Sequence, residues 1–134
     1  YQATDNLVLG FNATLTDGRP FGCIGTHPTD TFAQQYGDDS WFCAGQSTPR
    51  GSISKSDTIF SLDFSMAFDL GSAGIIKESF FKVDVFNILG QDGVDDINEY
   101  GENGGPSSYP QPYYQLPVSY QYPRQIRLGL EARF

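Results

Sequence analysis

Long apolar runs, basic side chains and histidine are all scarce in this chain of 134 residues. No run of about 18 apolar residues occurs, which excludes a membrane-spanning helix but not a membrane barrel, because barrel strands alternate and give no hydropathy peak. The 8 Lys and Arg stand against 16 Asp and Glu, a formal net charge of -8. We therefore expect no nucleic-acid partner, since binding to phosphates needs a basic face.

Histidine and cysteine are too few for several common kinds of site. His27 is the single histidine and no nucleophile motif flanks it, so we expect no catalytic residue and no enzyme activity. Cys23 and Cys43 lack the spacing of metal ligands. We expect them to form a disulfide in an oxidising compartment, with two free buried thiols as the alternative. No metal site and no cofactor are expected.

Acidic residues gather in the segment 90–122, which holds five acids and no Lys or Arg. Oxygen-rich clusters can bind Ca²⁺. However, Asp92, Asp95 and Asp96 lack the alternating spacing and the fixed glycine of an EF-hand loop. A solvated acidic loop is therefore the preferred interpretation, with a Ca²⁺ site as the alternative.

Aromatic residues, glycine and proline are abundant, with 11 Phe, 8 Tyr, 15 Gly and 8 Pro. This composition disfavours both a helical bundle and a disordered chain. Apolar and polar residues alternate with a period of two in four segments, 6–16, 56–70, 75–89 and 124–134. That period predicts β-strands, so we expect an all-β, antiparallel fold.

The connections between these segments differ greatly in length. Only residues 71–74 separate the second segment from the third, whereas 17–55 and 90–122 are long. Short turns at one end and long loops at the other are typical of an outer-membrane barrel. The alternation alone equally fits a soluble sandwich, but the length of the apolar stripe and the tyrosines before the last segment favour the barrel.

In such a barrel, alternate side chains face lipid and lumen. The expected lipid-facing residues of the two middle segments are Phe60, Leu62, Phe64, Met66, Phe68, Phe81, Val83 and Val85. The expected residues facing the lumen or a plug domain are Asp63, Asp69, Lys82, Asp84, Arg127, Glu131 and Arg133.

Two strand motifs resemble one family. Residues 122–134 begin near Pro123-Arg124 and end on an aromatic residue, as does the C-terminal strand of a TonB-dependent outer-membrane receptor. Residues 81–89 are similar to the penultimate strand of that family. The loop with Gly18-Arg19-Pro20, both cysteines and Pro49-Arg50-Gly51 resembles the branch with a carboxypeptidase-regulatory-like N-terminal domain.

The resemblance implies a barrel of twenty-two strands in the outer membrane of a Gram-negative bacterium, importing a ligand that the sequence does not identify. Because four strands cannot close a barrel, we expect this chain to be its C-terminal part. Its partners would be the rest of the barrel, the plug domain, outer-membrane lipid, and the TonB system through the missing N-terminal part. The residues implied as the assembly signal are Ile126, Leu128, Leu130, Ala132 and Phe134.

Aromatic residues in the two long loops are candidates for ligand contact. They are Trp41, Tyr100, Tyr109, Tyr113 and Tyr114. Packing of the loops on themselves is the alternative role for these rings. If the loops bind a ligand, their acidity disfavours anions and tolerates cations or peptides. The competing hypothesis for the whole chain is a secreted soluble β-sandwich that binds glycans or proteins through its disulfide loop.

Overall fold

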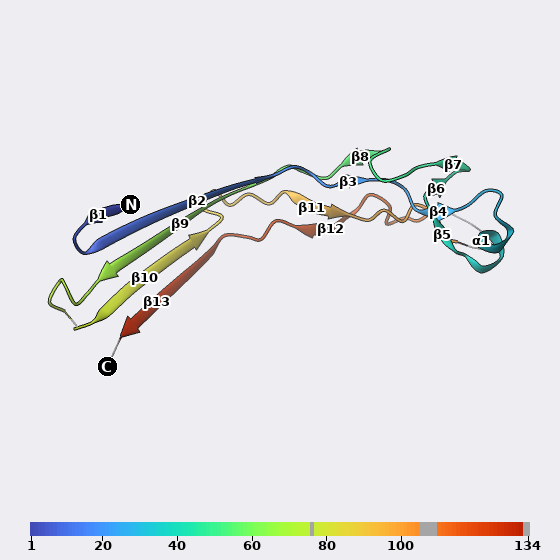
Figure 1. The fold of residues 1–134 in the computed structure, drawn as a ribbon. Coiled ribbons are helices and arrows are strands. Elements are labelled where there is room, and N and C mark those ends of the chain that lie inside the picture. Colours follow the sequence, from blue (N-terminus) through green and yellow to red (C-terminus); the bar gives the residue numbers. More distant parts are fainter. Residues whose placement is uncertain (76, 105–109, 133–134) are drawn as a thin grey trace. The chain divides into compact units, whose positions relative to one another are not determined.

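The described residues form antiparallel β-sheets and one short helix (Figure 1). This computed structural model describes residues 1–75, 77–104 and 110–132. The expectation of an all-β, antiparallel fold is confirmed. Contacts divide the chain into unit 1 (Tyr1–Thr16, Phe60–Asp92 and Tyr122–Phe134) and unit 2 (Asp17–Ile59 and Gly93–Gln121). No helix of the described residues is long and apolar enough to cross a membrane.

Unit 1 contains a five-stranded sheet. Its strands are β1 (Gln2–Thr4), β2 (Leu7–Thr16), β9 (Ile59–Asp69), β10 (Ser79–Phe86) and β13 (Gln125–Ala132), in the spatial order β1-β2-β9-β10-β13. Each of the four alternating segments contains one of these strands. The short edge strand β1 was not predicted, because three residues are too few to display a period.

The register places apolar side chains of neighbouring strands on one face. Val83 of β10 lies opposite Met66 of β9 and Leu128 of β13, and the same parity continues along all three strands. In β2, the Phe11 ring lies 5.2 Å from the Phe64 ring, which extends this face to a fourth strand. We call the following residues the apolar face: Phe11, Phe64, Met66, Phe68, Phe81, Val83, Val85, Ile126, Leu128 and Leu130.

The opposite, polar face carries cross-strand ion pairs. Asp84 lies opposite Arg127, which donates to Asp84 Oδ2 from Nε at 3.0 Å and from Nη2 at 2.7 Å. Lys82 reaches diagonally to Glu131, with an Nζ to Oε2 distance of 2.5 Å. Opposite charges placed in this way on neighbouring strands stabilise their pairing by about 0.2–1 kcal/mol.

Strand β10 is shorter at both ends than the predicted segment 75–89. At its far end, Asn87 adopts a φ of 48° and turns the chain, and its buried side-chain amide donates to the carbonyl oxygens of Gln91 and Tyr122. Asparagine tolerates this left-handed backbone better than most residues. At its near end, the connection 70–78 is more than twice the expected length.

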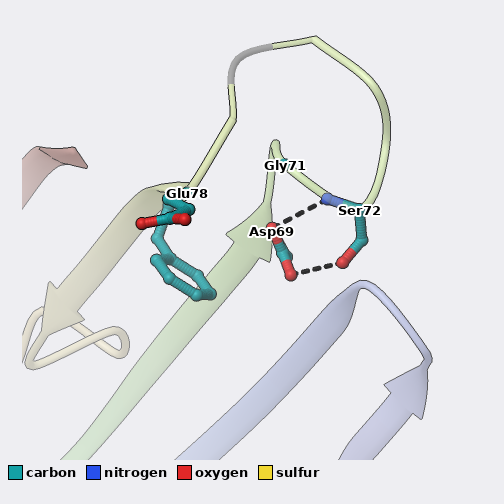
Figure 2. A pocket seen from close by; sticks show the side chains of 5 residues that line it. Asp69, Gly71, Ser72 and Glu78 are labelled. Carbon is teal, nitrogen blue, oxygen red and sulfur yellow. Dashed lines mark hydrogen bonds between the residues drawn. The ribbon is translucent and has the colours of Figure 1, made fainter. Parts of the chain in front are cut away.

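Asp69, the last residue of β9, holds the first residues of the connection 70–78 (Figure 2). The Asp69 carboxylate accepts from the backbone N–H and the hydroxyl of Ser72. Gly74 supplies a φ of 74° that glycine adopts at no steric cost. Beside this turn is a hollow of about 370 Å³, lined by Asp69, Gly71, Ser72, Glu78 and Phe80.

Strand β9 also begins later than the predicted residue 56. The Ser56 hydroxyl accepts from the backbone N–H of Arg19, and Asp57 Oδ2 accepts from that of Val94. These polar side chains bind backbone groups of unit 2. The alternating pattern of 56–58 therefore does not reflect membership of the sheet.

Unit 2 is made of very short elements. They are β3 (Pro20–Phe21), β4 (Gly25–Thr26), α1 (Thr31–Tyr36), β5 (Asp39–Ser40), β6 (Phe42–Cys43), β7 (Gln46–Ser47), β8 (Ser54–Lys55), β11 (Val94–Ile97) and β12 (Pro117–Tyr120). The strands form the pairs β3-β8, β4-β5, β6-β7 and β11-β12. Ladders this short give little stability of their own. Helix α1 is capped by Asp30, whose carboxylate accepts from Phe32 and Ala33, and it ends at Gly37 in the left-handed conformation.

Candidate functional site

The apolar face of unit 1 is the first candidate site because its large side chains are exposed. Phe11 is 70% exposed and Leu128 is 67% exposed. The buried hydrophobic residues of the described chain are Phe21, Cys23 and Ala33, all of which belong to unit 2. An exposed apolar surface of this kind marks a site for lipid or another protein.

The predicted residues of the strands fall on two faces. The predicted lipid-facing residues lie on the apolar face, namely Phe64, Met66, Phe68, Phe81, Val83 and Val85. Phe60 and Leu62 lie at alternate positions of β9 before Phe64 and so belong to the same side of the strand. Those predicted to face a lumen or plug lie on the polar face where they are described, namely Asp63, Asp69, Lys82, Asp84, Arg127 and Glu131. Arg133 and Phe134 lie outside the described residues.

The implied assembly-signal residues of β13 share the apolar face. Ile126 and Leu130 are each 66% exposed, and Ala132 is exposed as well. Strand β13 is an edge strand of the five-stranded sheet. An edge strand presents backbone N–H and C=O groups to another strand.

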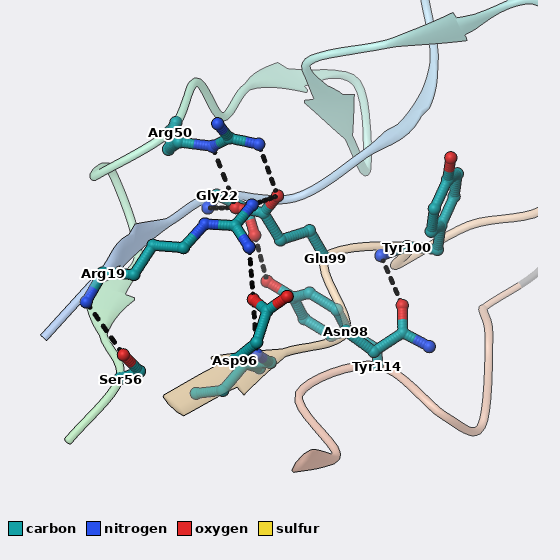
Figure 3. Close-up of polar contacts among 10 residues, drawn as sticks. Arg19, Gly22, Arg50, Ser56, Asp96, Asn98, Glu99, Tyr100 and Tyr114 are labelled. Carbon is teal, nitrogen blue, oxygen red and sulfur yellow. Dashed lines mark hydrogen bonds and ion pairs between the residues drawn. The ribbon is translucent and has the colours of Figure 1, made fainter. Parts of the chain in front are cut away.

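A second candidate site is a polar cluster in unit 2 around Glu99 (Figure 3). The Glu99 side chain is only 7% exposed. Arg50 donates from Nε to Glu99 Oε1 at 3.3 Å and from Nη2 to Oε2 at 3.0 Å. Arg19 donates to the same Oε2 at 3.3 Å and to Asp96 Oδ1 at 2.5 Å. We call these four residues the Glu99 cluster.

The Glu99 cluster joins the two long connections of the chain. Arg19 and Arg50 come from 17–55, whereas Asp96 and Glu99 come from 90–122. The backbone N–H of Gly22 also donates to Glu99 Oε1 at 3.3 Å. A buried carboxylate needs such partners, because losing its water without compensation is costly. The geometry is that of a structural clamp, since every Glu99 oxygen already accepts from protein donors.

This cluster corrects the interpretation of 90–122 as a solvated acidic loop for Asp96 and Glu99, whereas Asp92 and Asp95 are exposed. Asp96 and Glu99 are neutralised by arginines that lie about eighty and fifty positions away in the sequence, which no local pattern reveals. The alternative of a Ca²⁺ site gains no support. Among the described ranges, no three His, Cys, Asp or Glu side chains converge in a way that could hold a metal ion.

The candidate ligand-contact aromatics have separate surroundings. The Arg50 guanidinium lies over the Trp41 ring at 5.3 Å. Tyr100 is about half exposed, and the nearby Asp39 charge, a hydrogen bond to that carboxylate and some desolvation raise the pKa of Tyr100 above 10.0. The Tyr114 hydroxyl lies 3.5 Å from the Gly22 carbonyl oxygen. Tyr113 is exposed, and Tyr109 lies outside the described residues.

No ring contact joins Trp41, Tyr100, Tyr113 and Tyr114 in the part of the chain that the structure describes. They therefore do not form one aromatic platform. Trp41 and Tyr114 are half-buried and contact Arg50 and Gly22 of unit 2.

The disulfide between Cys23 and Cys43 is present, as predicted, with a Cα to Cα distance of 6.0 Å. It is surrounded by contacts that sequence reasoning missed. Gly101 lies so close that a Cβ at that position would overlap the Cys23 sulfur and stand 3.0 Å from the Cys43 sulfur. The glycine at 101 is the only sequence signal for this close approach, and a glycine alone does not show which residue packs against it.

Comparisons with known proteins do not identify a family for this chain. No protein-family model, no curated protein and no solved structure matches it.

Proposed function

We propose that this chain is the C-terminal part of the barrel of a TonB-dependent outer-membrane receptor. The apolar face lies against lipid, the polar face lines the barrel interior, and unit 2 lies on the extracellular side. In this proposal the whole receptor imports a ligand with energy from the inner membrane. The chain itself completes the barrel and supplies its assembly signal through β13.

The observation that carries the proposal is the exposed apolar face. Four adjacent strands place large hydrophobic side chains on one side, and unit 1 has no buried hydrophobic residue among those the structure describes. In water, these exposed side chains would lack the stabilisation that burial of apolar surface provides, which is about 25 cal/mol for each Å² buried. Contact with acyl chains removes that penalty.

The competing soluble sandwich is less well supported. A sandwich needs a second sheet packed about 10 Å from the first, with apolar side chains from both sheets between them. The described part of unit 1 supplies one sheet. The polar face cannot serve as a dry interface, because it carries the Asp84–Arg127 and Lys82–Glu131 ion pairs.

In this proposal, unit 2 presents a negatively charged surface to extracellular ligands. Unit 2 has three basic side chains in its sequence, Arg19, Arg50 and Lys55. Each of them is ion-paired to a carboxylate of the same unit. Acidic groups therefore outnumber free cations on this unit, which favours cations or basic peptides as ligands.

The first test compares two neighbouring residues of β9 in the full-length protein that contains this chain. Met66 belongs to the apolar face, whereas Ser65 points to the polar face and lies opposite Asp84. Met66→Lys should lower the amount of protein assembled in outer membranes, because lysine deep in a bilayer costs about 2–4 kcal/mol. Urea-resistant protein in isolated outer membranes is the measurement.

Ser65→Lys is the matched control, since it adds the same charge one residue away. It should assemble at the wild-type level, because it faces a hollow of about 270 Å³ that includes Asp63 and Asp84. Equal losses in both variants would contradict the proposed lipid face. Full-length protein that remains in buffer without detergent would favour the sandwich instead.

A further inference from the structure

We propose that residues 99–102 form a strap over the Cys23–Cys43 disulfide, and that this disulfide is reduced only when the strap opens. The strap comes from one long connection of the chain and the disulfide from the other. The inference concerns unit 2 alone, and it stands whether or not unit 1 crosses a membrane.

The backbone of the strap is fastened to the residue after the first cysteine. Ile24 donates its N–H to the Glu99 carbonyl oxygen at 2.7 Å. The Ile24 carbonyl oxygen accepts from the N–H groups of Gly101 at 2.9 Å and of Glu102 at 3.2 Å. These three hydrogen bonds hold the strap alongside the chain at Cys23.

The side chains at the two ends of the strap bind the backbone beside each cysteine. Glu99 Oε1 accepts from the N–H of Gly22, which precedes Cys23. Glu102 Oε1 accepts from the N–H of Ala44, which follows Cys43, at 2.7 Å. Hydrogen bonds to charged acceptors are the stronger kind, so both ends of the strap are well anchored.

The middle of the strap lies against the Cys23 sulfur. Gly101 lies where any larger side chain would overlap Cys23 Sγ, and the Tyr114 ring lies near the same position. Cys23 is only 3% exposed, whereas Cys43 is half-buried. A thiolate must reach a sulfur atom before it can attack it, and Cys23 Sγ lies buried against Gly101 while the strap is closed.

The chemistry concerned is thiol–disulfide exchange with an external dithiol. A thiolate of the dithiol attacks one sulfur, and the other cysteine leaves as a thiolate. The second thiol of the reductant then displaces the remaining cysteine. The dithiol is oxidised to its cyclic disulfide by loss of two electrons, and Cys23 and Cys43 become thiols. With the strap closed, the rate equals the fraction of open molecules multiplied by the rate in the open form.

The test is the rate at which dithiothreitol reduces this disulfide in the full-length protein, followed by acid quenching, alkylation and mass spectrometry of the two cysteine peptides. Gly101→Ala forces the strap away from the sulfurs, and Glu102→Ala removes the anchor at Ala44. Each variant should be reduced about tenfold faster or more than wild type, because the open fraction rises.

The controls are Asp95→Ala, which changes an exposed acid of the same connection, and Gly129→Ala, which adds a methyl group where there is ordinary room beside Lys82. Both should be reduced at the wild-type rate. Wild-type protein reduced as fast as the two strap variants would overturn the proposal, since attack at the half-buried Cys43 would then need no opening.

A second measurement covers the case in which Gly101→Ala fails to form the disulfide. In wild-type protein, a low urea concentration should accelerate the reduction of the disulfide and the hydrogen exchange of the Ile24, Gly101 and Glu102 amides by the same factor, because both need the strap to open. The Asp57 and Gln121 amides, which donate to Val94 and Gly93 carbonyl oxygens, should stay protected. A reduction rate that does not follow the exchange of the strap amides would show that reduction needs no opening of the strap, and would overturn the proposal.

Discussion

Glu99 is the residue on which the polar contacts of unit 2 converge. Its carboxylate binds Arg19, Arg50 and the Gly22 amide, and its carbonyl oxygen binds Ile24. The two arginine side chains are 41% and 49% exposed, so they could be hydrated again if Glu99 were lost. The cost of losing Glu99 is therefore mostly that of its own hydrogen bonds.

Replacing Glu99 by glutamine should weaken unit 2. Glu99→Gln keeps the shape but removes the charge that both guanidinium groups face, and a hydrogen bond to a charged group contributes about 1.5–3 kcal/mol. Native-state hydrogen exchange of the Ile24 amide should become about tenfold faster or more. Asp95→Asn, at an exposed position of the same connection, is the control and should leave this rate unchanged. An unchanged rate in Glu99→Gln would mean that the cluster contributes nothing to holding the two connections together.

At the scale of elements, the short ladders of unit 2 depend on side chains just outside them. The ladder of β3 and β8 contains only the pairs Pro20–Lys55 and Phe21–Ser54. The ion pair of Lys55 with Asp17 lies next to it, at 2.6 Å. Both side chains are exposed, so the pair fixes the register rather than supplying much stability.

This pair predicts a pH dependence. The Lys55 hydrogen bond, the Lys55 charge and the Gly18 amide lower the pKa of Asp17 below 3.8 in the folded protein. The contribution of the pair is therefore fully present above pH 3.8 and is lost as the pH falls through the lowered folded value. A ¹³C titration of the Asp17 carboxyl should give a midpoint below 3.8, and Lys55→Met should move it upward. Lys77→Met, in the connection 70–78, should not change it. A midpoint insensitive to Lys55→Met would show that the pair does not form in solution.

Periodicity predicted the long elements well and the short ones not at all. A strand of eight to eleven residues with one apolar face repeats its signal often enough to be recognised, as in β9 and β13. The two-residue strands of unit 2 have no period. Their positions depend on long-range contacts such as Arg50 with Glu99, and on the close approach of Gly101 to the disulfide. The cysteine pair was predictable because the chain offers only one pairing.

At the scale of the whole molecule, the proposed membrane topology puts unit 2 outside the cell and the connection 70–78 on the periplasmic side. Two glycines offer matched positions to test this. Gly45, at the tip of the β6-β7 hairpin, and Gly74 have φ values of 73° and 74°. A Cβ at either position meets no heavy atom within 4 Å.

An epitope inserted at Gly45 should be bound by antibody on intact cells, and the same epitope at Gly74 only after the outer membrane is permeabilised. Exposed loop tips tolerate such insertions, so both proteins should assemble. Urea resistance in isolated outer membranes confirms assembly before antibody is added. Labelling of both sites on intact cells would rule out the proposed orientation.

The ion pairs of the polar face have a consequence for how the last strand finds its place during folding. A slip of β13 by one residue would carry Arg127 and Glu131 to the apolar face, which is severely penalised. Slips of two residues keep the faces and are the dangerous errors. In one direction Arg127 would lie directly opposite Lys82, and this like-charge pairing is unfavourable. In the other direction Glu131 would lie opposite Lys82, while Arg127 would lose Asp84 and face Phe86. The charges therefore disfavour the two misalignments unequally. Repulsion between Arg127 and Lys82 opposes one slip, whereas the other slip costs only the Asp84–Arg127 ion pair.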